Sequence, residues 1–452
     1  MSTAYDSCLF KNIFGTEEIR DVFSEDAYIK NMILTEASLA KAEGQCDVIP
    51  NDIGDAIYEL GKDLTLSSID KSLLGEQTDV VGYCVLPLLN QLTAQFPENL
   101  SGYLHWGATT QDIMDTASML QIKKALEIVE NYLSDLITIL KDLAQKHKDT
   151  PMAGRTHWQH ALPITFGYKC AVWLSSLQRS YNRLQELKPR CLLVQFGGAA
   201  GTLASLGNDP NKGLDVRAKL ASLLGLNNPS ITWHVARDGI AEIINLLAII
   251  CGSLGKIALD IIAMSSNELD EVSEPYIPHR GASSTMPQKR NPISSEYILA
   301  SSKIVRANAG LVLDGLVADF ERASGPWHLE WVAIPESFIS TVGSLHQMKF
   351  TLDGLEIKAD SMLRNLESTK GLIVAEAVMM GLAPFIGRHD AHEIVYKCCV
   401  KAHDGKAALY DILRYEQKII DKVDLKVLKE LCDPINYLGC SSSMVDDVLN
   451  LK

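Results

Sequence analysis

The chain has 452 residues, of which 47% are hydrophobic and 22% are charged, as in an ordinary soluble globular protein. A chain of this length can bury a large core and divides into two or three domains. The net charge of −14 disfavours nucleic acids and anionic membranes as partners, so an anionic substrate would need locally placed basic residues.

The first 104 residues are predicted to form a mixed helical domain. Apolar residues recur at helical spacing between Ile19 and Glu43, and Pro50 ends that unit. A second helix is predicted from Asp79 to Phe96, with an interruption at Pro87.

Residues 105–350 are predicted to form a central domain built from an antiparallel bundle of long helices. The first expected helix begins after a loop that starts at His105, and Pro151 ends it. The other four expected helices cover residues 163–187, 237–267, 292–318 and 331–350. Strand signals are scarce, and residues 191–196 are the best candidate. Residues 351–452 are predicted to be a third domain of shorter helices, broken at Gly371, Pro384, Gly387 and Pro434. The predicted fold class is therefore all-α with three domains.

The segment Ile243 to Gly255 carries no charge over 13 residues. It is too short to span a bilayer, which needs about 20 apolar residues. A helix that is apolar on all sides is buried among other helices, and Gly252 and Gly255 would let a neighbour approach closely. Burial in an oligomer is the simplest explanation of this helix.

Cysteine and histidine spacings give no indication of a bound metal or cofactor. The ten cysteines occur singly, apart from Cys398 and Cys399, which favours a reducing cytosol over a disulfide framework or a zinc site. No signal peptide is expected. The His157/His160 and His389/His392 spacings lack a matching acidic or sulfur ligand. No Gly-x-Gly-x-x-Gly or Walker sequence occurs, so no nucleotide cofactor is expected.

The stretch from Arg280 to Pro292 has no helical or strand period, and we name it the signature loop. It leads into a predicted helix in which Pro292 is the first residue and Asn291 the cap. Such a loop directs free N–H groups and a partial positive charge at whatever it covers. Alternatively, it is a connector with solvated basic residues. The density of hydroxyl and basic side chains favours a carboxylate site: Ser283, Ser284, Thr285, Lys289 and Arg290.

The loop reads Gly-Ala-Ser-Ser-Thr-Met-Pro-Gln-Lys-Arg-Asn-Pro, which resembles the signature of the fumarase/aspartase superfamily. The resemblance implies that Ser283 is the catalytic base and that Lys289 and Asn291 bind a substrate carboxylate. Ser284 and Met286 are further candidate binding residues. The resemblance also implies the three-domain helical fold. It further implies a homotetramer in which the central helices share one core and each active site collects residues from three chains.

Three other loop-like motifs carry candidate site residues. Thr109, Thr110 and Gln111 precede the first long helix. Either Thr110 or Asp112 simply caps that helix, or the segment binds a substrate carboxylate, as the resemblance to the matching family segment implies. His157 lies in Arg-Thr-His-Trp-Gln, expected to be an ordered loop, and matches the family's proton donor or its partner.

The third motif spans residues 321–331, where Arg322 and His328 with Trp327 and Trp331 would give a charged clamp beside an apolar wall. Four of the six tryptophans adjoin a histidine. This clustering favours one shared pocket over packing at the ends of the bundle.

Nearly the whole chain resembles the 3-carboxy-cis,cis-muconate cycloisomerases, notably residues 195–207, 233–238, 325–331 and 433–439. Adenylosuccinate lyases carry a catalytic histidine where this chain has Thr78. The chain departs from the cycloisomerase pattern at two places. Gln288 stands where many of those enzymes have histidine, and the sequence Gly-Tyr-Cys-Val-Leu-Pro at 82–87 differs from their versions.

We therefore expect a cytosolic, cofactor-independent enzyme that acts on a small unsaturated polycarboxylate through an aci-carboxylate intermediate. The first candidate reaction is lactonisation of 3-carboxy-cis,cis-muconate. Decarboxylation of trans-aconitate, release of fumarate by an adenylosuccinate-type lyase, and an inactive structural homologue are the alternatives. The presence of Ser283, Lys289 and His157 argues against the last of these.

Overall fold

The computed structural model describes residues 3–322 and 325–451 and is all-α, as predicted. The chain forms two compact units. Unit 1 comprises Met1–Leu133, Ser180–Leu254 and Ala300–His346, and unit 2 comprises Ser134–Arg179, Gly255–Leu299 and Gln347–Lys452. The division into domains at residues 104 and 350 stays a prediction.

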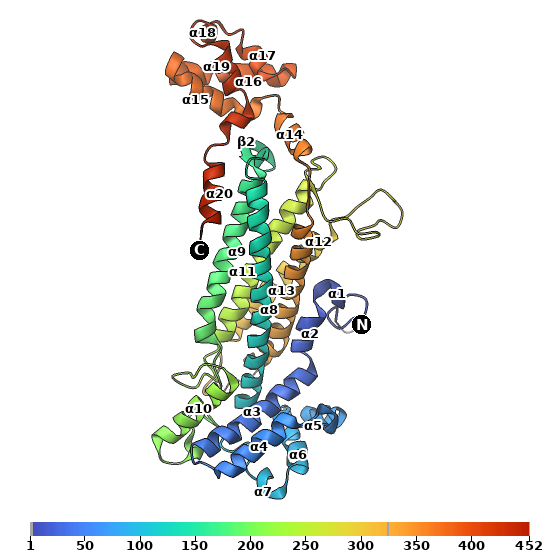
Figure 1. The fold of residues 1–452 in the computed structure, drawn as a ribbon, viewed down its shortest axis with the longest axis vertical. Coiled ribbons are helices and arrows are strands. Elements are labelled where there is room, and N and C mark those ends of the chain that lie inside the picture. Colours follow the sequence, from blue (N-terminus) through green and yellow to red (C-terminus); the bar gives the residue numbers. More distant parts are fainter. Residues whose placement is uncertain (1–2, 323–324, 452) are drawn as a thin grey trace. The chain divides into compact units, whose positions relative to one another are not determined.

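Five long helices form the framework of the chain, which confirms the predicted helical bundle. Within unit 1, segments of all five lie side by side (Figure 1). Their inward positions are filled by aliphatic side chains with almost no exposure, such as Leu133, Leu247 and Val342. The five are α8 Thr110–Lys146, α9 Phe166–Cys191, α11 Asp238–Met264, α12 Ile293–Asp314 and α13 Pro326–Asp353.

Short helices precede the bundle in unit 1. The predicted helix from Ile19 to Glu43 is divided, because the side chain of Ser24 accepts from Ala27 N and starts a new helix. The predicted helix from Asp79 to Phe96 is interrupted earlier than Pro87. A helix ends at Val81, and Gly82 caps its C-terminus with a φ of 87°. Pro87 itself is in the first turn of α6, where a missing N–H costs little. The elements are α1 Lys11–Phe14, α2 Glu17–Val22, α3 Glu25–Gln45, α4 Asn51–Asp63, η1 Leu66–Ser68, α5 Lys71–Val81, α6 Val85–Gln95 and α7 Glu98–Ser101.

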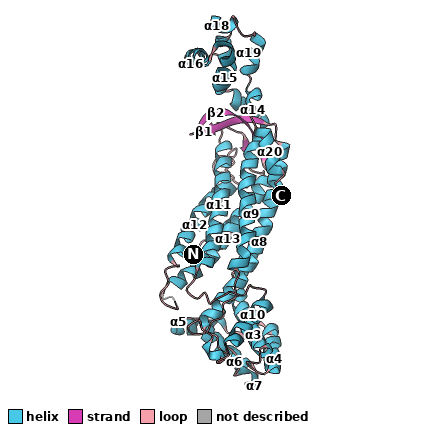
Figure 2. Ribbon diagram, turned by 90° about the vertical axis from the view of Figure 1, so that its left-hand side faces the viewer, coloured by secondary structure: helices cyan, strands magenta, loops and turns pink. Residues whose placement is uncertain are grey.

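The strands do not lie where the sequence predicted one. Residues 191–196 form only an isolated bridge between Leu193 and Asn227. Instead β1 Pro151–Thr156 and β2 Gln159–Thr165 form an antiparallel hairpin in unit 2, drawn in magenta in Figure 2. Residues 157 and 158 both have positive φ, the pattern of a tight two-residue hairpin turn. Two further short strands, β3 Val272–Ser273 and β4 Glu356–Ile357, pair with each other.

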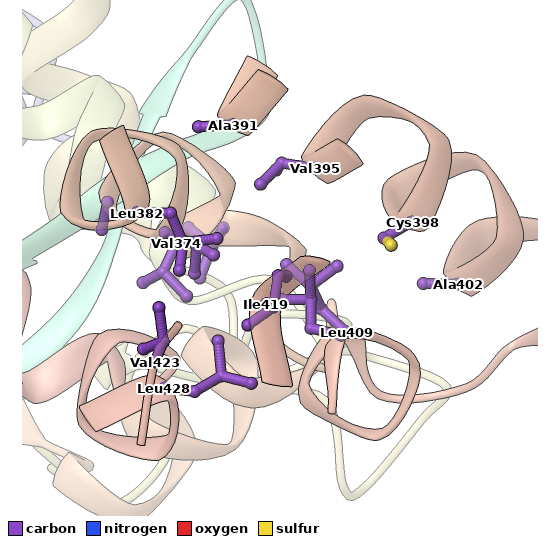
Figure 3. Close-up of a cluster of buried hydrophobic side chains, with 14 of the residues drawn as sticks. Val374, Leu382, Ala391, Val395, Cys398, Ala402, Leu409, Ile419, Val423 and Leu428 are labelled. Carbon is purple, nitrogen blue, oxygen red and sulfur yellow. The ribbon is translucent and has the colours of Figure 1, made fainter. Parts of the chain in front are cut away.

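Unit 2 ends in short helices around their own apolar core (Figure 3), as predicted. Val374, Leu382, Leu409 and Leu428 are fully or almost fully buried there. Pro384 does not break a helix, because it lies inside α15. The elements are α14 Ala359–Glu367, η3 Leu372–Val374, α15 Ala375–Ile386, α16 Arg388–Gly405, α17 Leu409–Leu413, α18 Gln417–Ile420, α19 Leu425–Leu431, η4 Pro434–Tyr437 and α20 Ser441–Leu449.

Within one chain, helix α11 is buried on one side and keeps an exposed stripe on the other, and the expected burial of Ile243 to Gly255 in an oligomer stays a prediction. Ile249 is 48% and Leu259 45% exposed, and a Cβ on Gly252 would meet open space. By length and composition, α11 is long and apolar enough to cross a membrane. The helical segments 359–367 and 372–386, which are bent against each other, meet the same criterion when they are taken together. Half of the apolar window of α11 is nevertheless buried, as in core helices of soluble proteins. Its exposed apolar stripe lacks a partner within the described chain.

Unit 1 also contains η2 Ala204–Leu206 and α10 Pro210–Leu224, which lie between α9 and α11. The residues just before η2 belong to a glycine-rich loop at 197–201, in which Gly198 and Gly201 have positive φ. This loop lies against the segment that begins α8, because a Cβ on Gly198 would come within 2.9 Å of the carbonyl oxygen of Gly107.

Candidate active site

Ser283 lies in the signature loop of unit 2, which Figure 1 draws as part of the long yellow loop between α11 and α12. The Ser283 hydroxyl oxygen accepts from two backbone N–H groups, those of Met286 (3.1 Å) and Thr285 (3.3 Å). The hydroxyl of Thr285 lies 3.4 Å away. Because N–H donors stabilise negative charge on oxygen, this turn is suited to a serine that loses its proton.

The N-terminus of α12 is already occupied by a carboxylate, which corrects the expectation of free N–H groups there. The side chain of Glu274 accepts from Ser294 N (3.2 Å), Ser295 N (2.8 Å) and the Ser295 hydroxyl (2.7 Å). The helix begins at Ile293 rather than at Pro292, and Glu274 rather than Asn291 caps it. A substrate anion bound by this loop therefore depends on side chains and loop amides.

A cleft of about 560 Å³ lies beside the loop, and Met286, Lys289 and Asn291 line it. Its other cations are already engaged. Arg280 donates to Ser294 Oγ (2.6 Å) and Gln347 Oε1 (2.7 Å), and Lys358 pairs with Asp270. Arg290, which also lines the cleft, donates to Glu274 O (3.2 Å). The ammonium group of Lys289 makes no hydrogen bond or ion pair within residues 3–322 and 325–451, although the backbone N–H of Lys289 donates to Met286 O (3.1 Å), so the ammonium is free to bind a ligand carboxylate. Ser283 and Ser284 are not part of the lining.

His157 is at the tip of the β1–β2 hairpin and is exposed, in place of the expected loop before a helix at Pro163. Close to the turn, Arg155 anchors the hairpin by binding the buried carboxylate of Glu271 through both terminal nitrogens (2.9 and 2.6 Å). His157 also lines a cleft of about 490 Å³ with Lys169. Burial lowers the pKa of Lys169, with Asp260 acting in the opposite direction. The hairpin thus presents an imidazole on a rigid support.

The predicted carboxylate residues at the start of α8 lie in unit 1. Arg322 donates to Thr109 Oγ1 (2.9 Å) and to the carbonyl oxygen of Ala199 (2.8 Å), so the structure brings Thr109 and Arg322 together. Thr110 is half-buried. Gln111 is fully buried, and its amide donates to His234 O (2.9 Å). Gln111 therefore holds the backbone of another segment and does not face an open cleft.

Sequence reasoning missed the role of Asp112, which joins three segments of unit 1. One carboxylate oxygen accepts from Gly197 N (3.0 Å) and lies 2.7 Å from His234 Nε2. The other accepts from Gly198 N (2.9 Å) and reaches back to Thr109 N (3.0 Å), as in a capping box. The signal available in the sequence was an acid three residues after a threonine that precedes a long helix.

A buried ion network was also missed. The guanidinium of Arg237 donates to Asp115 (2.7 and 3.0 Å) and to both carboxylate oxygens of Glu330, with Nε at 2.8 Å from the nearer one. All three side chains are about 3–4% exposed. Burial acts to lower the pKa of Arg237, but the two carboxylates outweigh it and raise the pKa. A lone arginine directly before α11, shortly ahead of the uncharged segment Ile243 to Gly255, was the sequence signal.

The motif at 321–331 includes Ala323 and Ser324, which lie outside the described residues. Within the described part, His328 packs against Trp331, with ring centroids 4.3 Å apart. Trp327 and Trp331 line a common cleft with Tyr83. Trp106 and Trp233, also in unit 1, are absent from that lining, so unit 1 does not gather its tryptophans into the single pocket that was expected.

A second polar cluster in unit 1 lies beside the Thr109 segment. His105 Nδ1 is 2.7 Å from Glu36 Oε1. Burial acts to lower the pKa of His105, but Glu36 outweighs it and the pKa is raised. Glu43, on the same helix as Glu36, is fully buried, and neither carboxylate oxygen has a partner among the described residues. Burial first, and then Glu36, raise the pKa of Glu43 to about 9.

Comparison with known proteins identifies the family. Residues 8–306 match a family model described as Lyase, and residues 371–448 match one described as Adenylosuccinate lyase C-terminus. The chain belongs to the fumarase/aspartase superfamily. It is 42% identical to Trans-aconitate decarboxylase 1 of Mycosarcoma maydis, over 97% of this chain and 88% of the relative. It is 39% identical to 3-carboxy-cis,cis-muconate cycloisomerase of Acinetobacter baylyi, over 98% of both chains.

A crystal structure described as fumarate lyase from Mesorhizobium sp. BNC1 superposes with a TM-score of 0.90. That chain is 47% identical, and the match covers 97% of this chain and 99% of the other. The predicted fold and family are confirmed, and the chain is an enzyme, a lyase or cycloisomerase of this superfamily. The roles of Ser283, His157 and the other site residues stay predictions, as does the cytosolic location.

Proposed function

We propose that this enzyme acts on a small, planar, unsaturated acid with three carboxylates, through a carbanion stabilised as an aci-carboxylate. The observation that supports it most is Lys289, an unpaired cation beside Asn291 in a cleft whose other cations are engaged. Arg322 with Thr109 supplies a second set of carboxylate donors. Each set suits one carboxylate and neither resembles a site for a nucleotide phosphate.

Lactonisation of 3-carboxy-cis,cis-muconate is the first candidate reaction. A carboxylate oxygen adds to the carbon β to another carboxylate, so a C–O bond forms and the π electron pair moves to the α carbon. A proton then adds to that carbon and the lactone is complete. Lys289 and Asn291 would hold the carboxylate on which the second negative charge develops, and Ser283 or His157 would supply the proton.

Decarboxylation of trans-aconitate is the second candidate, supported by Gln288 and the run at 82–87, which depart from the cycloisomerase pattern, and by the 42% identity to a decarboxylase. Here the C–C bond to one carboxylate breaks and carbon dioxide leaves. The electron pair passes through the double bond to the carbon next to another carboxylate, where a proton adds. Both reactions thus need the same two parts, donors for an aci-carboxylate and one proton donor.

We further propose that the enzyme is a homotetramer with active sites shared between subunits. The support is the exposed stripe of α11, where Ile249 and Leu259 are nearly half exposed in one chain and Gly252 leaves room for a close neighbour. Covering an apolar surface with identical surfaces of other copies is the usual symmetric solution.

The test is to assay the purified protein on 3-carboxy-cis,cis-muconate, trans-aconitate and adenylosuccinate, and to repeat the best reaction with Lys289→Met. We expect turnover of one of the two tricarboxylates, and a KM raised roughly tenfold to a hundredfold in the variant, because a charge-assisted hydrogen bond is lost. Lys426→Met, which removes an exposed lysine of α19, is the matched control and should leave KM unchanged. Much faster turnover of adenylosuccinate than of both tricarboxylates would contradict the proposal.

A further inference from the structure

Unit 1 contains a cleft of about 340 Å³ that the carboxylate chemistry does not use, and we name it the aromatic cleft. It lies among the α2–α3 junction, the α5–α6 link and the starts of α8, α11 and α13. Its apolar lining includes Phe23, Tyr83, Met114, Trp327 and Trp331.

Three rings form one wall of the aromatic cleft. Tyr83 stacks on Trp327 with ring centroids 5.8 Å apart, and Trp331 meets both edge-on, at 6.2 Å from Tyr83 and 5.2 Å from Trp327. Trp327 is fixed by its indole N–H, which donates to Asp115 Oδ1 (3.0 Å). Because the three rings already pack against one another, a ligand that binds on them causes little further loss of side-chain conformational entropy.

The charges around the aromatic cleft disfavour a further anion. Arg237 is the single cation in the lining formed by the described residues, and its donors are directed to Asp115 and Glu330. Glu25 adds another acid to the lining. A carboxylate or phosphate placed here would find no free cation and would face buried acids, which is costly in a desolvated site. An anion therefore does not fit, and the apolar side chains that make up most of the lining favour an uncharged occupant.

The aromatic cleft is close along the chain to the predicted carboxylate donors. Met114 and Asp115 follow Thr110 by four and five residues on α8, a rise of about 6–8 Å. Trp327 follows Arg322 by five residues. A ligand whose carboxylate binds Thr109 and Arg322 can thus extend an uncharged group toward the three rings.

We propose that the aromatic cleft binds an uncharged, apolar group attached to the carboxylate-bearing part of a substrate. This inference rests on the proposed function, and it widens the substrate class to succinate-like and unsaturated acids with a ring-sized apolar substituent. A cavity of about 150 Å³ accepts benzene in another protein, so a cleft of about 340 Å³ has room for such a group. Tyr83, Trp327 and Trp331 act as specificity-determining residues.

The test is equilibrium binding by calorimetry with three probes: succinate, benzyl alcohol and 2-benzylsuccinate. Succinate reports the carboxylate donors alone, and benzyl alcohol reports the aromatic cleft alone. We expect 2-benzylsuccinate to bind roughly ten to a hundred times more tightly than succinate, as expected for burying a phenyl group.

Two variants locate the effect. Trp331→Ala removes part of the wall, and Thr78→Phe fills the cleft from α5. Both should bring the affinity ratio of 2-benzylsuccinate to succinate toward one while leaving succinate affinity unchanged. Tyr396→Ala, which removes an exposed ring from α16, should leave the ratio as in the parent protein.

The outcomes separate the two proposals. Binding of benzyl alcohol without binding of succinate supports the cleft and contradicts the carboxylate site. Binding of succinate with an affinity ratio near one, or a ratio that neither variant changes, overturns the inference about the cleft and leaves the proposed function standing. Failure of all three probes to bind overturns both.

Discussion

The network of Arg237, Asp115 and Glu330 allows the stability of unit 1 to be tested with one substitution. Arg237→Met keeps an unbranched apolar chain of similar length and removes the guanidinium. Two carboxylates that are 3–4% exposed then lose their cation, along with the N–H groups that hold both oxygens of Glu330. Because breaking a buried ion pair leaves an uncompensated charge, we expect a loss of about 3–5 kcal/mol in the free energy of unfolding.

The assay is urea denaturation followed by far-UV circular dichroism, at one fixed protein concentration because the proposed assembly would contribute to stability. The loss should be smaller at pH 5 than at pH 7, because burial raises the pKa of Glu330 and protonation removes the unpaired charge more readily at low pH. Arg190→Met breaks an exposed pair with Glu242 and should cause no resolvable loss. A loss below about 1 kcal/mol for Arg237→Met, or one independent of pH, would refute the reasoning.

Three further predictions concern catalysis, pH dependence and assembly. Ser283→Ala should lower kcat by roughly a thousandfold or more without changing the circular dichroism spectrum, because the hydroxyl held by two loop amides is lost. Glu43→Gln should become more stable relative to the parent protein as the pH rises from about 5 to 9. Folded Glu43 keeps a proton that the unfolded chain releases, which costs about 1.4 kcal/mol per pH unit in that window. Leu259→Glu should dissociate the proposed tetramer, measured by light scattering, because it places a charge on the exposed stripe of α11.

Each of these has a result that would contradict it. Near-native turnover of Ser283→Ala would mean that another group moves the proton. Parallel stability curves for Glu43→Gln and the parent protein across pH 5–9 would show that folded Glu43 is ionised. A parent protein that is monomeric and active in dilute solution would exclude shared active sites, whatever the behaviour of Leu259→Glu.

The long helices could be predicted from the sequence because each repeats apolar residues at helical spacing over many turns. Helix ends were less certain, since they depend on single capping residues such as Ser24 and Gly82. The β1–β2 hairpin was missed because its turn is His157-Trp158 rather than a glycine or asparagine pair, so tertiary contacts hold two residues at positive φ.

The candidate site was predictable only where chemistry and sequence are contiguous, as in the signature loop. The binding of Glu274 at the N-terminus of α12 could not be predicted from the sequence, because Glu274 lies 20 residues before its partner Ser294. The same holds for Asp112 and Arg237, whose partners come from segments more than 80 residues away. Long-range pairing of buried charges leaves little trace in a single sequence.

The central claim is that the enzyme protonates an aci-carboxylate formed on a small unsaturated tricarboxylate. The most direct measurement is proton NMR of each candidate tricarboxylate incubated with the purified protein in deuterium oxide. We predict one product from one of the two acids, with a single deuterium on the carbon next to a carboxylate, and no deuterium incorporation at that carbon with Ser283→Ala over the same time. Unchanged spectra for both acids, under conditions in which adenylosuccinate is converted to fumarate, would contradict the claim.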